Sequence, residues 1–137
     1  MGRIVGIDYG KKRTGIAVTD SLQLIANGLT TIPSEEVYQF LEQYTQKETV
    51  DTFVVGLAKQ MNNEPSESME FITPFVNGLK KRFSTIEIVF FDERFTSVLA
   101  HQTMLEGGLK KKDRQNKALV DQISATILLQ SYMESRR

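Results

Sequence analysis

The chain has 137 residues, of which 40% are hydrophobic and 25% charged, and its 17 basic residues balance its 17 acidic residues. This composition is typical of a globular protein, and the length predicts one domain spanning residues 1–137. The chain has no cysteine and one histidine, which excludes disulfides and thiolate metal sites and leaves carboxylates as the candidate catalytic groups. It has no apolar run of about 18 residues and no signal segment, so we expect a cytoplasmic protein that binds no membrane.

Three strands with short connections are predicted first. Residues 3–9 alternate apolar side chains with glycine, a turn follows at 10–12, and residues 13–19 return as the second strand of a hairpin. Residues 28–32 predict a third strand, closed by Pro33. Strands in this order form an antiparallel meander.

A helix is predicted after the third strand. Ser34 precedes two glutamates, so we expect its hydroxyl to cap the helix, with the acids near the positive end of the helix dipole. Apolar residues then recur at spacings of three and four, which places them on one helical face. These residues are Val37, Phe40, Leu41 and Tyr44.

Two further strands complete the predicted sheet. Residues 52–57 and 86–91 are short apolar runs typical of buried parallel strands, and a helix over 65–83 connects them, with a kink or break at Pro74. Further helices are expected over residues 96–106 and 117–133. The sequence therefore predicts an α/β fold: a mixed sheet, with a three-strand antiparallel meander plus parallel strands, and helices on both faces.

Acidic residues at two strand ends are candidate chemical groups. Asp8 lies near the carboxyl end of the first strand, on the face shared by Ile4 and Gly6, and this end of a sheet commonly holds ligands. An aspartate that only accepts hydrogen bonds in the turn is an equally good interpretation. Asp92 and Glu93 follow the strand 86–91, and because adjacent side chains point to opposite sides, we expect only one of them to face the site.

A third acid lies on the last predicted helix. Asp121 shares a helical face with Ala125 and Leu128, where a carboxylate is costly unless it is paired or binds a cation. The alternative is a rim position paired with Lys117, one turn away. Three separated acids with almost no imidazole favour Mg²⁺ or Mn²⁺, which can activate water and stabilise the leaving oxygen in phosphodiester hydrolysis.

More than half of the basic residues are clustered in the sequence. A single cluster is typical of a solvated loop or helix end, but several clusters around an acidic site would bind a phosphate backbone. Gly10 and Gly15 flank the first turn and would let a polyanion approach the backbone. The positions expected to bind nucleic acid are Lys11, Lys12, Arg13, Arg94, Lys110, Lys111, Lys112 and Arg114.

These motifs, in this order over nearly the whole chain, resemble the YqgF/RuvX family. The resemblance is carried by Gly6-Ile7-Asp8-Tyr9-Gly10, Gly15-Ile16-Ala17-Val18, Val55-Gly56-Leu57, Asp92-Glu93-Arg94-Phe95-Thr96-Ser97 and Val120-Asp121 through Leu129. It implies an RNase H-like, Holliday-junction-resolvase-type fold, a divalent metal, active-site acids at Asp8, Glu93 and Asp121, and a role in maturing the 5′ end of 16S rRNA. One departure concerns the loop after Leu57, where Ala58 replaces the family's usual proline and the expected glycine is missing.

Three functions remain to be compared. The first is a metal-dependent nuclease acting on structured RNA, that is, pre-16S rRNA or ribosomal particles. The second is a Holliday junction resolvase that cuts branched DNA. The third is a non-catalytic RNA-binding ribosome-assembly factor, which the full set of acids disfavours because a pure binder gains nothing from carboxylates facing phosphate. A monomer and a homodimer are both compatible with the sequence.

Overall fold

The structure, a computed structural model, describes residues 2–57, 65–91 and 117–136. One sheet is formed by β1 (Arg3–Tyr9), β2 (Arg13–Thr19), β3 (Ala26–Pro33), β4 (Val50–Leu57) and β5 (Glu87–Phe90). The strand order is β3-β2-β1-β4-β5. The first three strands pair antiparallel, β4 lies parallel to β1, and β5 lies parallel to β4. The predicted meander with added parallel strands is confirmed.

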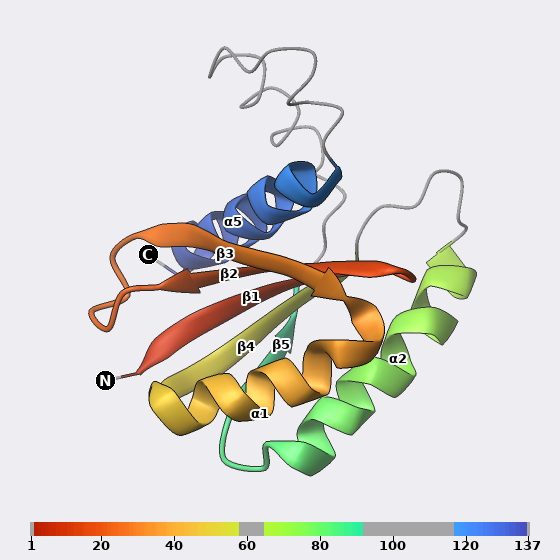
Figure 1. Ribbon diagram of the computed structural model, residues 1–137, viewed down its shortest axis with the longest axis horizontal. Helices are drawn as coiled ribbons and strands as arrows, with labels where there is room; N and C mark the ends of the chain where they lie inside the picture. Colours follow the sequence, from red (N-terminus) through yellow and green to blue (C-terminus); the bar gives the residue numbers. More distant parts are fainter. Residues whose placement is uncertain (1, 58–64, 92–116, 137) are drawn as a thin grey trace.

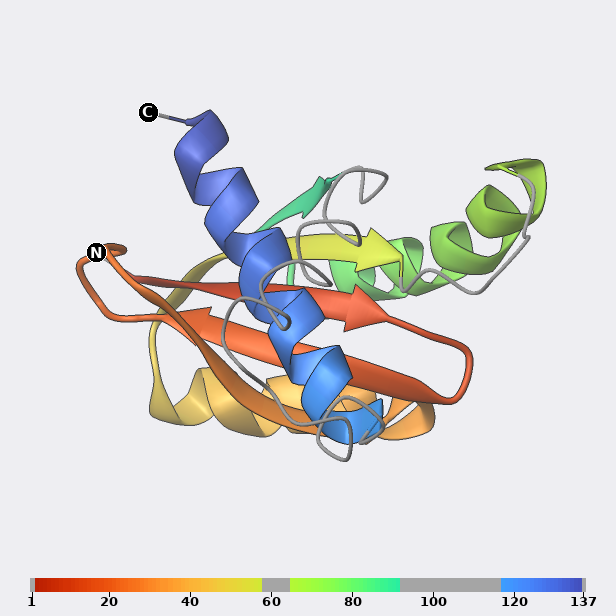
Figure 2. The same cartoon turned by 90° about the horizontal axis from the view of Figure 1, so that it is seen from above.

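Helices cover both faces of this sheet (Figure 1). The short 3-10 helix η1 (Ser34–Glu36) leads into α1 (Val37–Lys47), which lies with α2 (Pro65–Arg82) on one face. Helix α5 (Lys117–Ser135) lies on the opposite face and crosses the meander obliquely (Figure 2). In the described part of the chain, no helix has the length and apolar character that a membrane span needs. The predicted α/β class, with helices on both faces, is confirmed.

One hydrophobic core lies between the sheet and helices α1 and α2. Val5 and Ile7 of β1 point into it and are fully buried. Helix α1 packs on this core through the apolar face predicted from its sequence spacing. That face consists of Val37, Phe40, Leu41 and Tyr44.

A second core lies between the sheet and α5. Ile4 of β1 is buried in it together with Ala125 and Leu129 of the helix. Gly6 allows the close approach of α5, because a Cβ atom at this position would lie 3.0 Å from the Leu129 Cβ and 3.1 Å from the Ala125 carbonyl oxygen. Since side chains alternate along a strand, Asp8 points to this same α5 face.

Several elements differ from the prediction. Strand β4 begins at Val50 rather than at residue 52, and β5 spans Glu87–Phe90 rather than residues 86–91. Strand β3 begins at Ala26 rather than at residue 28 and includes Pro33. Helix α2 continues through Pro74 without interruption, so of the predicted kink or break, the break is wrong. Proline removes only one backbone donor, and Ile72 and Phe75 on either side of it are buried in the core, which holds the helix together. The helix predicted at 96–106 lies outside the described residues.

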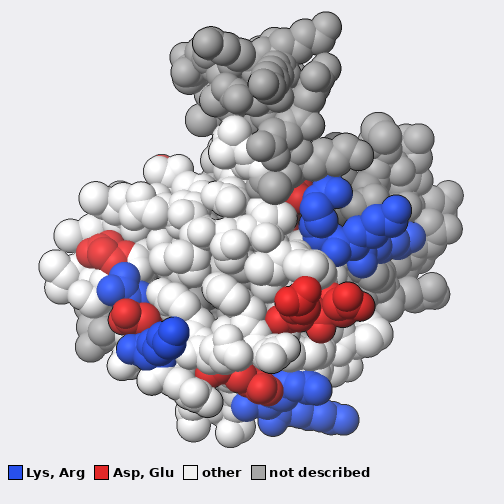
Figure 3. Space-filling model, viewed as in Figure 1, with Lys and Arg blue, Asp and Glu red and all other residues white. Residues whose placement is uncertain are grey.

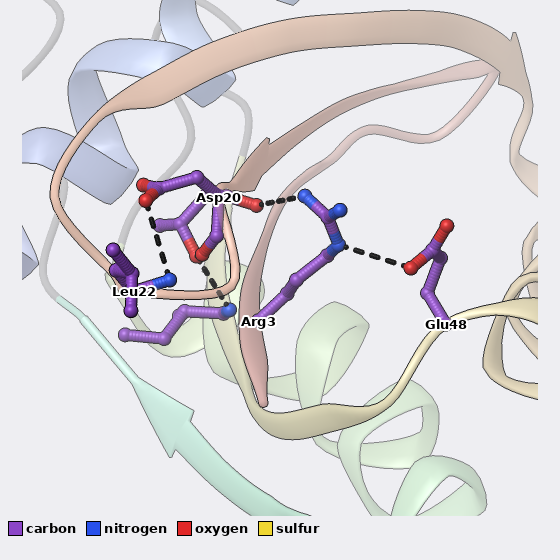
Figure 4. Close-up of polar contacts among 6 residues, drawn as sticks. Arg3, Asp20, Leu22 and Glu48 are labelled. Carbon is purple, nitrogen blue, oxygen red and sulfur yellow. Dashed lines mark hydrogen bonds and ion pairs between the residues drawn. The ribbon is translucent and has the colours of Figure 1, made fainter. Parts of the chain in front are cut away.

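The end of the sheet at which β1 begins is closed by polar contacts (Figure 4). Arg3 Nη1 donates a hydrogen bond to the Thr19 carbonyl oxygen at 2.9 Å, and Arg3 Nε donates to Glu48 Oε2 at 3.2 Å. The Asp20 carboxylate accepts hydrogen bonds from the backbone N–H groups of Leu22, Leu24 and Ile25. These bonds, chiefly those from Ile25 and Leu24, hold the pKa of Asp20 below its ordinary value. The predicted site residues of β1 and β2 lie at the other end.

Candidate active site

Asp8 is a buried carboxylate near the end of β1. It is 3% exposed, and it pairs with Gly15 of β2 on one side and with Gly56 of β4 on the other. Both cross-strand neighbours lack a side chain, so neither crowds the carboxylate on its face of the sheet. Burial of a charged group is costly unless the group is paired or binds a cation. The burial of Asp8 therefore makes it a candidate cation ligand.

Helix α5 brings Asp121 to the same place. A Cβ atom on Gly15 would overlap the Asp121 carbonyl oxygen and would lie 3.2 Å from the Asp121 Cβ. Gly15 is the direct cross-strand partner of Asp8, and the Cα atoms of paired strand residues lie about 4.5–5.5 Å apart. Asp8 and Asp121, from opposite ends of the sequence, thus lie beside one another on one face of the sheet.

This packing corrects the interpretation of Gly15. The sequence predicts that Gly15 leaves its backbone open to a polyanion, but the first turns of α5 cover it. The missing side chain makes room for the helix rather than for a ligand.

Asp121 forms an ion pair with Arg13. Arg13 Nε donates to Asp121 Oδ2 at 2.8 Å, and the two side chains are 42% and 19% exposed, respectively. Arg13 precedes Gly15 by two residues in β2, so both lie on the α5 face of the sheet. The side chain of the predicted partner, Lys117, is not among those that the structure describes. The observed partner of Asp121 is Arg13, which comes from strand β2, far away in the sequence.

Lysine and arginine side chains gather over the turn between β1 and β2 (Figure 3). Lys11, Lys12 and Arg13 are exposed there, next to the acidic side chains of η1. The structure therefore places three of the residues predicted to bind nucleic acid at the same end of the sheet as Asp8 and Asp121.

Ser34 braces this basic turn. Its hydroxyl donates to the Gly10 carbonyl oxygen and shares a 2.8 Å hydrogen bond with Thr14 Oγ1, while its backbone N–H donates to the Lys12 carbonyl oxygen at 3.0 Å. The prediction that Ser34 caps the helix is wrong, because Pro33 occupies the N-cap position and no side chain caps η1. The sequence pattern did not reveal this bracing role, since a serine before two glutamates is also typical of a cap.

The two described carboxylates fit a divalent cation of the magnesium type. Mg²⁺ and Mn²⁺ prefer carboxylate oxygens, and Asp8 and Asp121 supply them from two rigid elements on one face. Within residues 2–57, 65–91 and 117–136, no group of three metal-ligating side chains is gathered. The other predicted site residues, together with the departure at Ala58, lie outside the described residues: Glu93, Arg94, Lys110, Lys111, Lys112 and Arg114.

This arrangement is an RNase H-like fold: a mixed five-stranded sheet with an antiparallel meander, flanked by helices on both faces. A solved structure supports this class. The Thermus thermophilus RuvC chain in a complex with a Holliday junction substrate aligns with a TM-score of 0.56, covering 99% of this chain and 96% of that chain. The identity is 14%, so this likeness concerns the fold alone.

Sequence comparison identifies the family. The RuvX family model, described as Holliday junction resolvase, matches residues 2–135, and the chain belongs to this family. A relative from Bacteroides thetaiotaomicron is 67% identical over 137 residues, covering 100% of this chain and 99% of that protein. A relative from Flavobacterium johnsoniae is 55% identical with the same coverage. Both relatives carry the provisional name pre-16S rRNA nuclease.

Proposed function

We propose that this protein is a nuclease that hydrolyses phosphodiester bonds during maturation of the 5′ end of 16S rRNA in the cytoplasm. Membership of the RuvX family and the provisional names of full-length relatives support the reaction and the substrate. The observation that carries the chemistry is the meeting of Asp8 and Asp121 across Gly15.

Asp8 and Asp121 are the proposed ligands of a Mg²⁺ or Mn²⁺ ion, with Glu93 as the third acid. When bound, such an ion lowers the pKa of a coordinated water and stabilises the charge that develops on the leaving oxygen. The burial of Asp8 favours cation binding, because a buried charge is screened less by water than an exposed one. The backbone of Asp121 packs closely on Gly15, and this packing fixes the position of Asp121 relative to Asp8.

The basic turn is the proposed contact for the phosphate backbone. Lys11, Lys12 and Arg13 lie at the same end of the sheet as the two acids, and Arg13 contacts Asp121, so their positive charges would hold a polyanion near the cation. The remaining proposed contacts come from the later basic positions Arg94, Lys110, Lys111, Lys112 and Arg114.

Cleavage of a precursor transcript tests the proposal. The variants D8N and D121N should lose Mg²⁺-dependent cleavage of an RNA that carries the 5′ extension of 16S rRNA, while they remain folded and still bind this RNA in EDTA. The control E36Q removes an exposed acid of η1 near the same turn and should cleave like the parent. Cleavage by D8N at the parental rate would contradict the proposal.

A Holliday junction resolvase is the second candidate, supported by the description of the family and by the RuvC-like fold. It predicts a homodimer that makes two symmetric cuts in a four-way DNA junction. Gel filtration and a junction-cleavage assay distinguish it from a nuclease that acts as a monomer on RNA. A non-catalytic assembly factor would instead bind RNA with a salt-dependent affinity and show no metal-dependent turnover.

A further inference from the structure

Asp121 accepts a hydrogen bond from only one of the three guanidinium nitrogen atoms of Arg13. Arg13 Nε donates to Asp121 Oδ2 at 2.8 Å. Its terminal Nη1 and Nη2 atoms have no hydrogen-bond acceptor among the residues that the structure describes. The Arg13 side chain is 42% exposed, so part of it is accessible to a ligand from solution.

Arginine has the geometry to contact two anions at once. Its planar group presents five N–H donors in a rigid fork, so one edge can hold a carboxylate while the Nη1 and Nη2 pair binds a phosphate in bidentate fashion. Lysine has the same charge but concentrates it on a single ammonium group at the end of a flexible chain. A lysine at position 13 would therefore keep the phosphate attraction and lose the fixed contact with Asp121.

The contact also determines where the Asp121 carboxylate lies. The backbone of Asp121 is fixed over Gly15, and the Nε–Oδ2 hydrogen bond restrains the side chain beyond it. The hydrogen bond to Oδ2 restrains the rotamer of Asp121, and it does not involve the second carboxylate oxygen, Oδ1. Hydrogen bonds of this kind, from a neighbouring residue to a metal-ligating carboxylate, commonly change metal affinity 10-fold to 100-fold when they are removed.

We propose that Arg13 is a positioning residue that couples the cation site to the nucleic acid: its Nε–H orients the Asp121 carboxylate towards the cation, and its Nη1–Nη2 edge binds a backbone phosphate. The proposal rests on the proposed function, because it assumes a cation held by Asp8 and Asp121. It assigns to one side chain two effects that separate variants can distinguish.

The variants R13K and R13Q, with K12Q as the matched control, test the coupling. Lys12 is an exposed neighbour in the same turn, and K12Q removes one charge without touching Asp121. Mn²⁺ binding to the RNA-free protein is measured by titration calorimetry. Binding of a labelled RNA with the 5′ extension of 16S rRNA is measured in EDTA over a series of salt concentrations, and circular dichroism checks that each variant is folded.

R13K should bind this RNA within about threefold of the parent and with the same salt dependence, because its charge is unchanged. Its Mn²⁺ dissociation constant should rise by about 10-fold or more. R13Q should lose Mn²⁺ affinity and also reduce the slope of log K against log salt by about 1. K12Q should show the reduced slope with parental Mn²⁺ affinity.

Parental Mn²⁺ affinity in R13K would overturn the coupling, and so would tighter binding, which would make Arg13 a competitor of the cation. The variant D8N separates this failure from a failure of the proposed function. If D8N binds Mn²⁺ as tightly as the parent, the cation site itself is wrong. If D8N loses Mn²⁺ and R13K does not, only the role of Arg13 is wrong.

Discussion

The carbonyl oxygen of Asp121 lies over Gly15 so closely that a β-carbon on Gly15 would overlap it. Gly15 is also the strand partner of Asp8, so one glycine fixes the relative position of the two acids. The atom that blocks a side chain belongs to the backbone of α5 and cannot rotate away. Any residue larger than glycine must therefore move the helix.

The substitution G15A should destabilise the protein by about 1–3 kcal/mol, the usual cost of overpacking, and should weaken Mn²⁺ binding because it displaces Asp121. G28A is the matched control on the same face. A Cβ atom on Gly28 would lie 3.2 Å from Thr126 Oγ1 and 3.4 Å from Gln122 Oε1, which are side-chain atoms able to shift. Urea unfolding of both variants measures the difference, and equal stabilities would contradict this account of Gly15.

The substitution S34A should loosen the basic turn. It removes the bond to the Gly10 carbonyl oxygen and leaves the buried Thr14 hydroxyl without this partner, so we expect a loss of about 1–2 kcal/mol in the free energy of unfolding. S135A is the control, because Ser135 makes one hydrogen bond at the exposed end of α5. Chemical denaturation compares the two, and an S34A protein as stable as S135A would show that the brace contributes nothing.

The ionised Asp20 carboxylate in the loop after β2 should stabilise the fold less in acid. The backbone bonds from Ile25 and Leu24 lower the pKa of Asp20 in the folded state below its ordinary value of 3.8. The ionised carboxylate therefore stabilises the fold above about pH 4, and this contribution is lost as the pH falls below 3.8. D20N should be less stable than the parent at pH 7, and the difference should shrink towards pH 2.

Thermal unfolding across this pH range provides the measurement for D20N. E134Q is the control, since it removes the same charge from an exposed position of α5. A difference between D20N and the parent that stays constant from pH 7 to pH 2 would assign the effect to something other than the charge of Asp20.

Much of the fold follows from local sequence patterns. The apolar and glycine residues of β1 and β2, with turn residues between the two strands, predicted the bounds 3–9 and 13–19, which are those of the structure. Pro74 led to the prediction of a kink or break in α2. The break does not occur, since a helix packed on a core tolerates the loss of one backbone hydrogen bond. Packing energy of this kind is not visible in a local pattern.

The site was less predictable because its contacts are long-range. Sequence spacing offers Asp121 only partners on its own helix, such as Lys117, whereas the observed partner Arg13 is 108 residues away. Gly15 was recognised as special, but its role depends on which helix covers it. Ser34 was assigned a capping role because both a cap and a brace use the same hydroxyl. The roles of Asp8, Glu93 and Asp121 in chemistry stay predictions.

Anomalous diffraction from crystals soaked in MnCl₂ tests the central claim most directly, because it locates the cation without reference to activity. We expect the strongest anomalous peak at coordination distance from carboxylate oxygens of both Asp8 and Asp121, and its loss in D8N crystals. A strong peak that contacts neither carboxylate, or no peak beside Asp8 at saturating Mn²⁺, would contradict the account.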